Sequence, residues 1–222
     1  MKLAGGRKTG RLAGFLTALA LLLALTGCGM TGLNAKGYVQ GLVNETYLGV
    51  YDETYLALVD LTLEQAEADH QAGLDAEFLR FARYFQLDPQ ALSQETRARF
   101  TEYLNRVYEQ ARCTVEYATR SDSGAWLVEV TVQPIRTFAP LLEEDLPVLL
   151  SQWEEDGNAA PGQRQEAWAA AVLELCQNAP MEYGEAVTLA VRIVPDEEGR
   201  YGIGAQDFYN LDALILTYGE VD

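Results

Sequence analysis

Few side chains in this 222-residue sequence carry the chemistry of a catalytic group. His70 is the only histidine, and it follows Asp69, so it could act as a general base or as a pH sensor. Its position between Ala66 and Leu74 is on an apolar helical stripe, which equally fits a histidine at the edge of the core with one ring nitrogen hydrogen-bonded. Histidine catalysis needs partner groups within reach, and the sequence places none.

Two acidic clusters, Glu143-Glu144-Asp145 and Glu154-Glu155-Asp156, flank a predicted helical segment. Paired carboxylates can act as acid and base or bind Ca²⁺, but neither cluster has the alternating oxygen ligands of a calcium loop. Acidic residues at a helix start also stabilise its dipole without any function. The sequence contains no Gly-x-Ser-x-Gly elbow and no phosphate-binding glycine loop. We therefore expect no enzyme, no metal and no cofactor.

Cysteine is the other reactive residue type, and it occurs three times. Cys113 and Cys176 fall on apolar faces of a predicted strand and a predicted helix. They could form one disulfide in an oxidising compartment, or they could remain two buried thiols. With a single histidine in the chain, no zinc-type spacing exists. The third cysteine, Cys28, has a different context.

Cys28 closes the tetrapeptide Leu25-Thr26-Gly27-Cys28 at the end of an apolar run that begins near Leu12. Four basic residues precede the run: Lys2, Arg7, Lys8 and Arg11. A basic start, a short apolar stretch and small residues before a cleavage point are typical of a secretory signal peptide. The run is shorter than the roughly 18–20 residues of a transmembrane helix. We therefore predict a signal peptide over residues 1–27.

The tetrapeptide Leu25-Thr26-Gly27-Cys28 resembles the lipobox of bacterial lipoproteins. The resemblance implies cleavage between Gly27 and Cys28 and lipidation of the Cys28 thiol with a diacylglyceryl group. One acyl chain anchors a protein only marginally, whereas two anchor it stably. The implied partner is membrane lipid, bound through the acylated N-terminal cysteine, at the outer face of the cell membrane.

Four further stretches resemble the N-terminal part of uncharacterised surface lipoproteins of Gram-positive bacteria. They are Tyr38-Val39-Gln40-Gly41, Tyr47-Leu48-Gly49, Thr62-Leu63-Glu64-Gln65-Ala66 and the stripe of Phe78, Phe81 and Phe85. The resemblance implies a Gram-positive cell surface. It implies no activity.

Composition limits the partners of the mature chain. Without residues 1–27 the chain has 195 residues, with 12 basic and 33 acidic side chains and a net charge of −21. This length is enough for one sizeable core. So acidic a surface argues against nucleic acid as a partner. A protein or a small ligand remains possible as the partner of the folded part.

The periodicity predicts the elements that follow the anchor. Residues 28–36 are small and polar and predict a short lipidated tether, followed by a single extracytoplasmic domain over residues 37–222. Apolar pairs at helical spacing predict helices on both sides of Gly49. Thr62 and Gln65 form the capping box of a longer helix, and Asp88-Pro89 predicts the start of the next. A split into two domains near residue 135 is the alternative.

Alternation of apolar and polar residues then predicts two hairpins. The first runs through Cys113, Val115 and Tyr117, turns at 121–124 and ends at Pro134. Pro140 and Pro147 predict a short helix and a break within 137–156, and residues 162–179 predict an alanine-rich helix. The second hairpin has Val187–Ile193 as its first strand and turns at 196–199, and a terminal helix is favoured after it. Two hairpins can combine into one four-stranded antiparallel sheet with helices packed on it, an α+β fold.

The sequence thus favours a membrane-anchored lipoprotein with a non-enzymatic binding or interaction module. The alternative is a cone-shaped domain, nuclear-transport-factor-like or cystatin-like, whose pocket binds a small ligand or carries an activity. A pocket containing His70 or two close carboxylates would favour that alternative, and a filled core would count against it. A solute-binding subunit of a transporter is less favoured, because the chain lacks the alternating strands and helices of such lobes.

Overall fold

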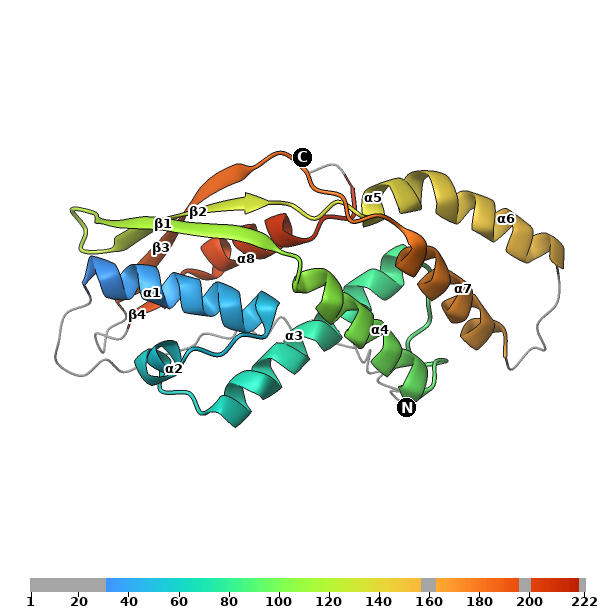
Figure 1. The fold of residues 1–222 in the computed structure, drawn as a ribbon, viewed down its shortest axis with the longest axis horizontal. Helices are drawn as coiled ribbons and strands as arrows, with labels where there is room; N and C mark the ends of the chain where they lie inside the picture. Colours follow the sequence, from blue (N-terminus) through green and yellow to red (C-terminus); the bar gives the residue numbers. More distant parts are fainter. Residues whose placement is uncertain (1–30, 157–162, 196–200, 220–222) are drawn as a thin grey trace, which may run out of the picture.

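Figure 1 shows the computed structural model, which describes residues 31–156, 163–195 and 201–219. The predicted signal peptide, Cys28 and the turn at 196–199 lie outside these residues. The helices are α1 (Gly32–Val43), α2 (Glu53–Val59), α3 (Leu63–Tyr84), α4 (Gln94–Tyr108), α5 (Phe138–Pro140), α6 (Leu146–Asp156), α7 (Arg164–Asn178) and α8 (Ala205–Ile215), with π-helical turns η1 (Asn44–Leu48) and η2 (Leu141–Asp145). The strands are β1 (Arg112–Arg120), β2 (Trp126–Gln133), β3 (Val187–Pro195) and β4 (Tyr201–Ile203).

The four strands form one antiparallel sheet in the order β1-β2-β3-β4, which confirms the predicted α+β class. Val130 of β2 pairs with Val115 of β1 and with Leu189 of β3. The register of β1 shifts by one residue between Val115 and Ala118, which is a β-bulge. The bulge leaves Tyr117 62% exposed, although simple alternation places it on the same face as Val115.

One face of the sheet is buried and the other is open. Helix α1 packs against β1 and β2, and α8 packs against β2 and β3 (Figure 1). The buried face is β-branched: Val115, Val128, Val130, Val132, Val191 and Ile193. The opposite face carries polar side chains, and the hydroxyl oxygens of Thr131 and Thr188 are 2.8 Å apart across it. The alternation in the sequence therefore predicts both faces correctly outside the bulge.

Helix α3 and its C-terminal cap contribute Phe78, Phe81 and Phe85 to the aromatic core. Its capping box is present as predicted: Gln65 N donates to Thr62 Oγ1 at 3.2 Å, and Thr62 N donates to Gln65 Oε1 at 2.9 Å. The predicted apolar stripe is buried through Ala66, His70, Leu74, Phe78, Phe81 and Phe85, whereas Leu63 one turn earlier is 50% exposed. Phe81 stacks on Phe85 with ring centroids 4.2 Å apart and contacts Phe138 at 5.2 Å.

Side-chain hydrogen bonds to the backbone connect the helices behind this core. Trp168 Nε1 of α7 donates to the carbonyl of Phe85 at 3.1 Å, and Tyr103 of α4 donates to the carbonyl of Cys176 at 3.0 Å. Ile135 is fully buried and pairs by isolated bridges with Tyr183 and Leu216. Residue 135, the alternative point for a split, thus lies where three chain segments meet.

Three predicted boundaries differ from the structure. Residues 32–36, predicted as part of the tether, form the start of α1, and the hydroxyl of Thr31 accepts from Asn34 N as its cap. Asp88-Pro89 is not a helix start: Asp88 accepts from Gln90 N in a turn, and α4 begins after Ser93. An aspartate before proline fits a turn and a helix cap equally well, which is why the sequence misplaced this start.

The break predicted within 137–156 is also wrong, because α5, η2 and α6 follow one another directly. Pro140 lies in the first turn of this run, where no backbone donor is needed. Before Pro147 the helix widens: Leu146 N donates to the carbonyl of Leu141, five residues back. A π-helical turn changes the hydrogen-bond register and so accommodates the proline.

Candidate functional site

His70 is buried, and both of its ring nitrogens are engaged. Nδ1 lies 3.0 Å from the carbonyl oxygen of Thr46, and Nε2 lies 2.9 Å from Oδ1 of Asn105. The Asn105 amide nitrogen donates to Glu109 at 2.9 Å, so its oxygen is the atom that faces the histidine. Neither ring nitrogen is open to a substrate. The arrangement agrees with the structural reading of His70, and it joins η1, α3 and α4.

Glu45 lies beside this histidine on η1. It is 3% exposed, and Thr46 donates a hydrogen bond to its carboxylate at 3.2 Å. The pKa of Glu45 is raised to about 7, mainly by burial; the hydrogen bond from Thr46 and the nearby His70 offset part of the rise, and the negative charge of Asp69 adds to it. Burial also raises the pKa of Asp69. A group that titrates near neutrality can exchange protons under physiological conditions.

A second buried acid, Glu77, lies on the core side of α3. Its carboxylate accepts a hydrogen bond from the hydroxyl of Tyr108 at 3.0 Å and another, short one from the hydroxyl of Tyr218. Nη1 of Arg80 is 3.6 Å away from the same carboxylate. Helix α3 thus contributes Glu77 and Arg80 at this point, and helix α4 and the segment after α8 each contribute one tyrosine.

Asp212 of α8 extends this network towards the surface. Arg80 lies between the two acids, 4.0 Å from Asp212, and its guanidinium is 5.0 Å from the ring centroid of Tyr218. Tyr47 of η1 donates to Asp212 at 3.2 Å. We call the group of Glu77, Arg80, Asp212 and the hydroxyls of Tyr47, Tyr108 and Tyr218 the acid–tyrosine network.

Burial sets the protonation behaviour of the network. It raises the pKa of Glu77, and the hydrogen bond from Tyr218 and the charge of Arg80 offset only part of that rise. Burial raises the pKa of Asp212 as well, again partly offset by Arg80. The pKa values of Tyr108 and Tyr218 are raised by burial too, so both hydroxyls stay protonated and donate. A carboxylate held by two tyrosines and an arginine is a satisfied buried group.

Sequence reasoning missed this network, although one signal for it was available. Glu77 lies between Leu74 and Phe81 at the spacing of the apolar stripe, so its position predicts burial despite its charge. A charged residue at a core position is informative because it must find partners. The positions of Asp212, Tyr47 and Tyr218 relative to Glu77 carry no such signal, since they depend on how distant segments pack.

The other residues singled out in the sequence are placed apart. Cys113 and Cys176 are free thiols, and burial raises the pKa of Cys113 to about 11. Glu143, Glu144 and Asp145 are exposed on η2, whereas the side chains of 154–156 lie outside the described residues. Over the residues described, no cluster of three or more histidine, cysteine or acidic side chains is arranged to hold a metal ion. No helix in the same residues is long and apolar enough to span a bilayer.

Comparisons with known proteins add one likeness. No known protein family matches the chain, and no curated protein matches it. Among solved structures, a protein of Bacillus subtilis, YcdA, described as a candidate lipoprotein, shares the fold with a TM-score of 0.59 and 9% sequence identity. The likeness covers 82% of this chain and 56% of YcdA, so the chain spans little more than half the length of that protein.

Proposed function

We propose that the chain is an extracytoplasmic lipoprotein, held at the outer face of the cell membrane through acylated Cys28. The observation that carries the proposal is the lipobox-like Leu25-Thr26-Gly27-Cys28 after a basic and apolar leader, three residues ahead of the cap of α1. The shared fold with a candidate lipoprotein supports it independently of the leader. A Gram-positive surface is the location that this likeness and the N-terminal stretches favour.

We further propose that the domain binds a protein or a small ligand rather than catalysing a reaction. Both nitrogens of His70 and the carboxylate of Glu77 are already engaged within the fold. The rings of Phe81, Phe85 and Phe138 are fully buried and contact one another in the core. Because these side chains already bond and pack within the fold, they support a stable scaffold that binds a partner rather than an active site.

The alternative, a pocket-forming domain, is favoured by the partial exposure of Arg80 and Asp212 at the edge of the acid–tyrosine network. Such a pair could contact a small polar ligand. If it does, Asp212→Asn, which keeps an acceptor for the Tyr47 hydroxyl, abolishes binding of that ligand while the thermal stability of the domain falls only modestly.

Mass spectrometry of the protein isolated from membranes tests the anchor. The expected N-terminal peptide begins at Cys28 and carries the mass of a diacylglyceryl group, with or without a third acyl chain. Cys28→Ala should yield an unacylated product that retains residues 1–27, while Cys176→Ala, the matched cysteine control, should keep the wild-type N-terminus. A wild-type product with an unmodified Cys28 would refute the anchor.

A further inference from the structure

The first turn of α1 is the part of the described structure that follows residue 28 most closely in the sequence, and its contacts hold it against the sheet. Thr31 caps the helix, with its hydroxyl accepting from Asn34 N at 3.2 Å. A β-carbon added to Gly32 would lie 3.1 Å from the ring of Trp126 and 3.5 Å from the carbonyl oxygen of Ala118. The start of α1 is therefore packed directly on β1 and β2.

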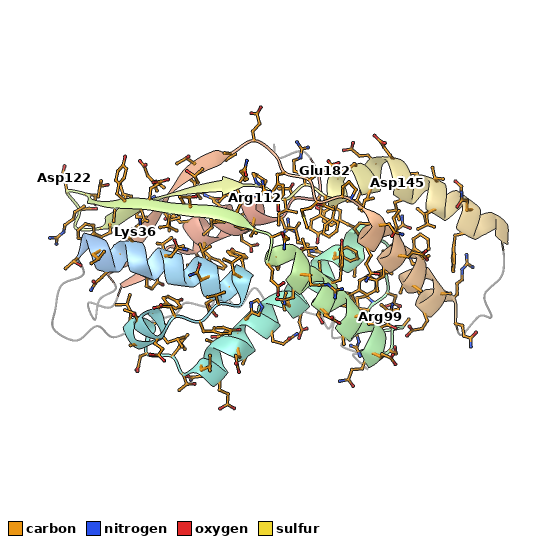
Figure 2. All side chains as sticks on the ribbon, in the orientation of Figure 1. Lys36, Arg99, Arg112, Asp122, Asp145 and Glu182 are labelled. Atoms are coloured by element: carbon orange, nitrogen blue, oxygen red, sulfur yellow. The ribbon has the colours of Figure 1, made fainter. Side chains whose placement is uncertain are left out.

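This contact places the start of α1 at the turn of the first hairpin. Trp126 and Arg120 are the residues that pair across β1 and β2 immediately before the turn at 121–124, and the Arg120 guanidinium is 5.9 Å from the Trp126 ring centroid. Figure 2 shows Lys36 and Asp122 at the same end of the long axis, with Asp145, the last residue of η2 directly before α6, well removed from them. We call residues 31–36 together with 121–124 the anchor end.

The chain between Cys28 and Thr31 is too short to let this end move far from an anchor. Three residues span at most about 11 Å when fully extended. A compact domain of this size is roughly 40 Å across. An acyl group on Cys28 therefore restricts which part of the domain can approach the bilayer, even if the two linking residues adopt every accessible conformation.

The side chains of the anchor end fit a lipid surface. Leu33, at the second position of α1, is 80% exposed, and Lys36, the only lysine after Cys28, is exposed on the same side of the helix. Residues 31–44 contain no acidic side chain in a mature chain of net charge −21. Helices α2, α3, α4, α7 and α8 each carry an acidic residue in the first turn, where the helix dipole favours it, whereas α1, α5 and α6 carry none.

We propose that the anchor end lies against the lipid bilayer, with Leu33 and Lys36 facing the headgroup region and α6 held away from it. This inference rests on the proposed acylation of Cys28. Apolar and basic side chains are the two kinds that favour a lipid interface, and repulsion between an acidic body and anionic headgroups keeps the rest of the domain away.

Quenching by a nitroxide on the lipid headgroup tests this orientation. The full acylated chain carries a fluorophore on the added cysteine of Asp122→Cys or of Asp145→Cys. It is placed in vesicles of phosphatidylethanolamine and phosphatidylglycerol, and its fluorescence is measured. Both aspartates are exposed, so neither substitution disturbs the core. The signal of protein without an added cysteine gives the background from Cys113 and Cys176. We expect quenching at position 122 to exceed that at position 145 by a factor of about two or more, since contact quenching reaches much less far than the length of the domain.

Flotation of the same vesicles separates the two proposals. If the labelled acylated chains float and both positions are quenched equally, or position 145 more strongly, the orientation is overturned while the anchor stands. If they do not float, the anchor fails and the orientation fails with it. A Cys28→Ala chain freed of residues 1–27 should neither float nor be quenched at either position.

Discussion

At the scale of single residues, the most constrained group is Glu77. Its carboxylate is 5% exposed and depends on Tyr108, Tyr218 and Arg80 for compensation. Removing one member of such a cluster leaves the others buried without partners, which costs more than the cluster contributes when intact. The acid–tyrosine network therefore acts in stability whether or not it contacts a ligand.

Glu77→Ala is expected to lower the free energy of unfolding by about 3–5 kcal/mol, because Arg80 and two tyrosine hydroxyls lose their acceptor. Urea denaturation followed by circular dichroism measures the change. Glu67→Ala is the matched control, since Glu67 is an exposed acid on the same helix, and it should change stability by no more than about 0.5 kcal/mol. Equal effects of the two variants would contradict a structural role for the network.

Glu45 predicts a pH dependence of stability. Its pKa is about 7 in the folded state and about 4.5 ordinarily, so the folded state holds the proton more tightly than the unfolded state. The free energy of unfolding should therefore fall as the pH rises from about 4.5 to about 7, by on the order of 1–3 kcal/mol from this group. Asp69, Glu77 and Asp212 have raised pKa values and act in the same direction.

Glu45→Gln isolates the contribution of this one group. The variant should gain stability relative to the wild type at pH 8, and the gain should vanish towards about pH 3, where Glu45 is protonated in both states. Urea midpoints at the two pH values provide the comparison. A constant difference between the two proteins at both pH values would show that Glu45 does not titrate in this range.

At the scale of elements, local signals in the sequence determine where a helix starts or ends, whereas packing determines whether neighbouring helices join. The α3 capping box was predicted because its hydrogen bonds join residues three apart in sequence. The sequence does not predict the continuous run through α5, η2 and α6. Its continuity depends on the π-helical hydrogen bond before Pro147, from Leu146 N to the carbonyl of Leu141, which forms only in the folded helix. Element ends fixed by local bonds are thus more predictable than element continuity.

Thr62→Ala removes the cap of α3 and should lower the free energy of unfolding by about 1 kcal/mol. The variant loses the side-chain acceptor for Gln65 N, while the backbone hydrogen bonds of α3 remain. Thr101→Ala in the middle of α4 serves as the control, because its hydroxyl only donates back to the carbonyl of Ala98. Thermal melts of both variants check this, and an equal loss in each would rule out a specific capping effect.

At the scale of the whole molecule, the main feature is the large net negative charge of the chain. Downstream of residue 27 the chain has 33 acidic and 12 basic side chains, and few of the acids described are paired with a base. Self-repulsion of this size destabilises the compact state and is screened by salt. The same charge keeps the body of the domain away from anionic surfaces.

The melting temperature of residues 29–222 should rise as sodium chloride increases from about 10 to about 300 mM, because the Debye length falls below the spacing of surface charges. Replacing Glu143, Glu144 and Asp145 by their amides removes three exposed charges and should reduce the size of this rise. Differential scanning calorimetry measures both. A melting temperature that stays constant or falls with salt would contradict net repulsion.

The sequence by itself determined the α+β class, the two hairpins and their buried face, the cap of α3 and the burial of its stripe. These features depend on residues close in the chain, whose periodicity is visible without any structure. The signal peptide and Cys28 remain sequence predictions, because they lie outside the described residues. Only the tertiary structure decided that Glu77, Arg80 and Asp212 meet, that both nitrogens of His70 are engaged, and that the start of α1 lies at the hairpin turn. Each of these depends on the packing of segments far apart in the chain, and a single sequence carries no direct record of such contacts.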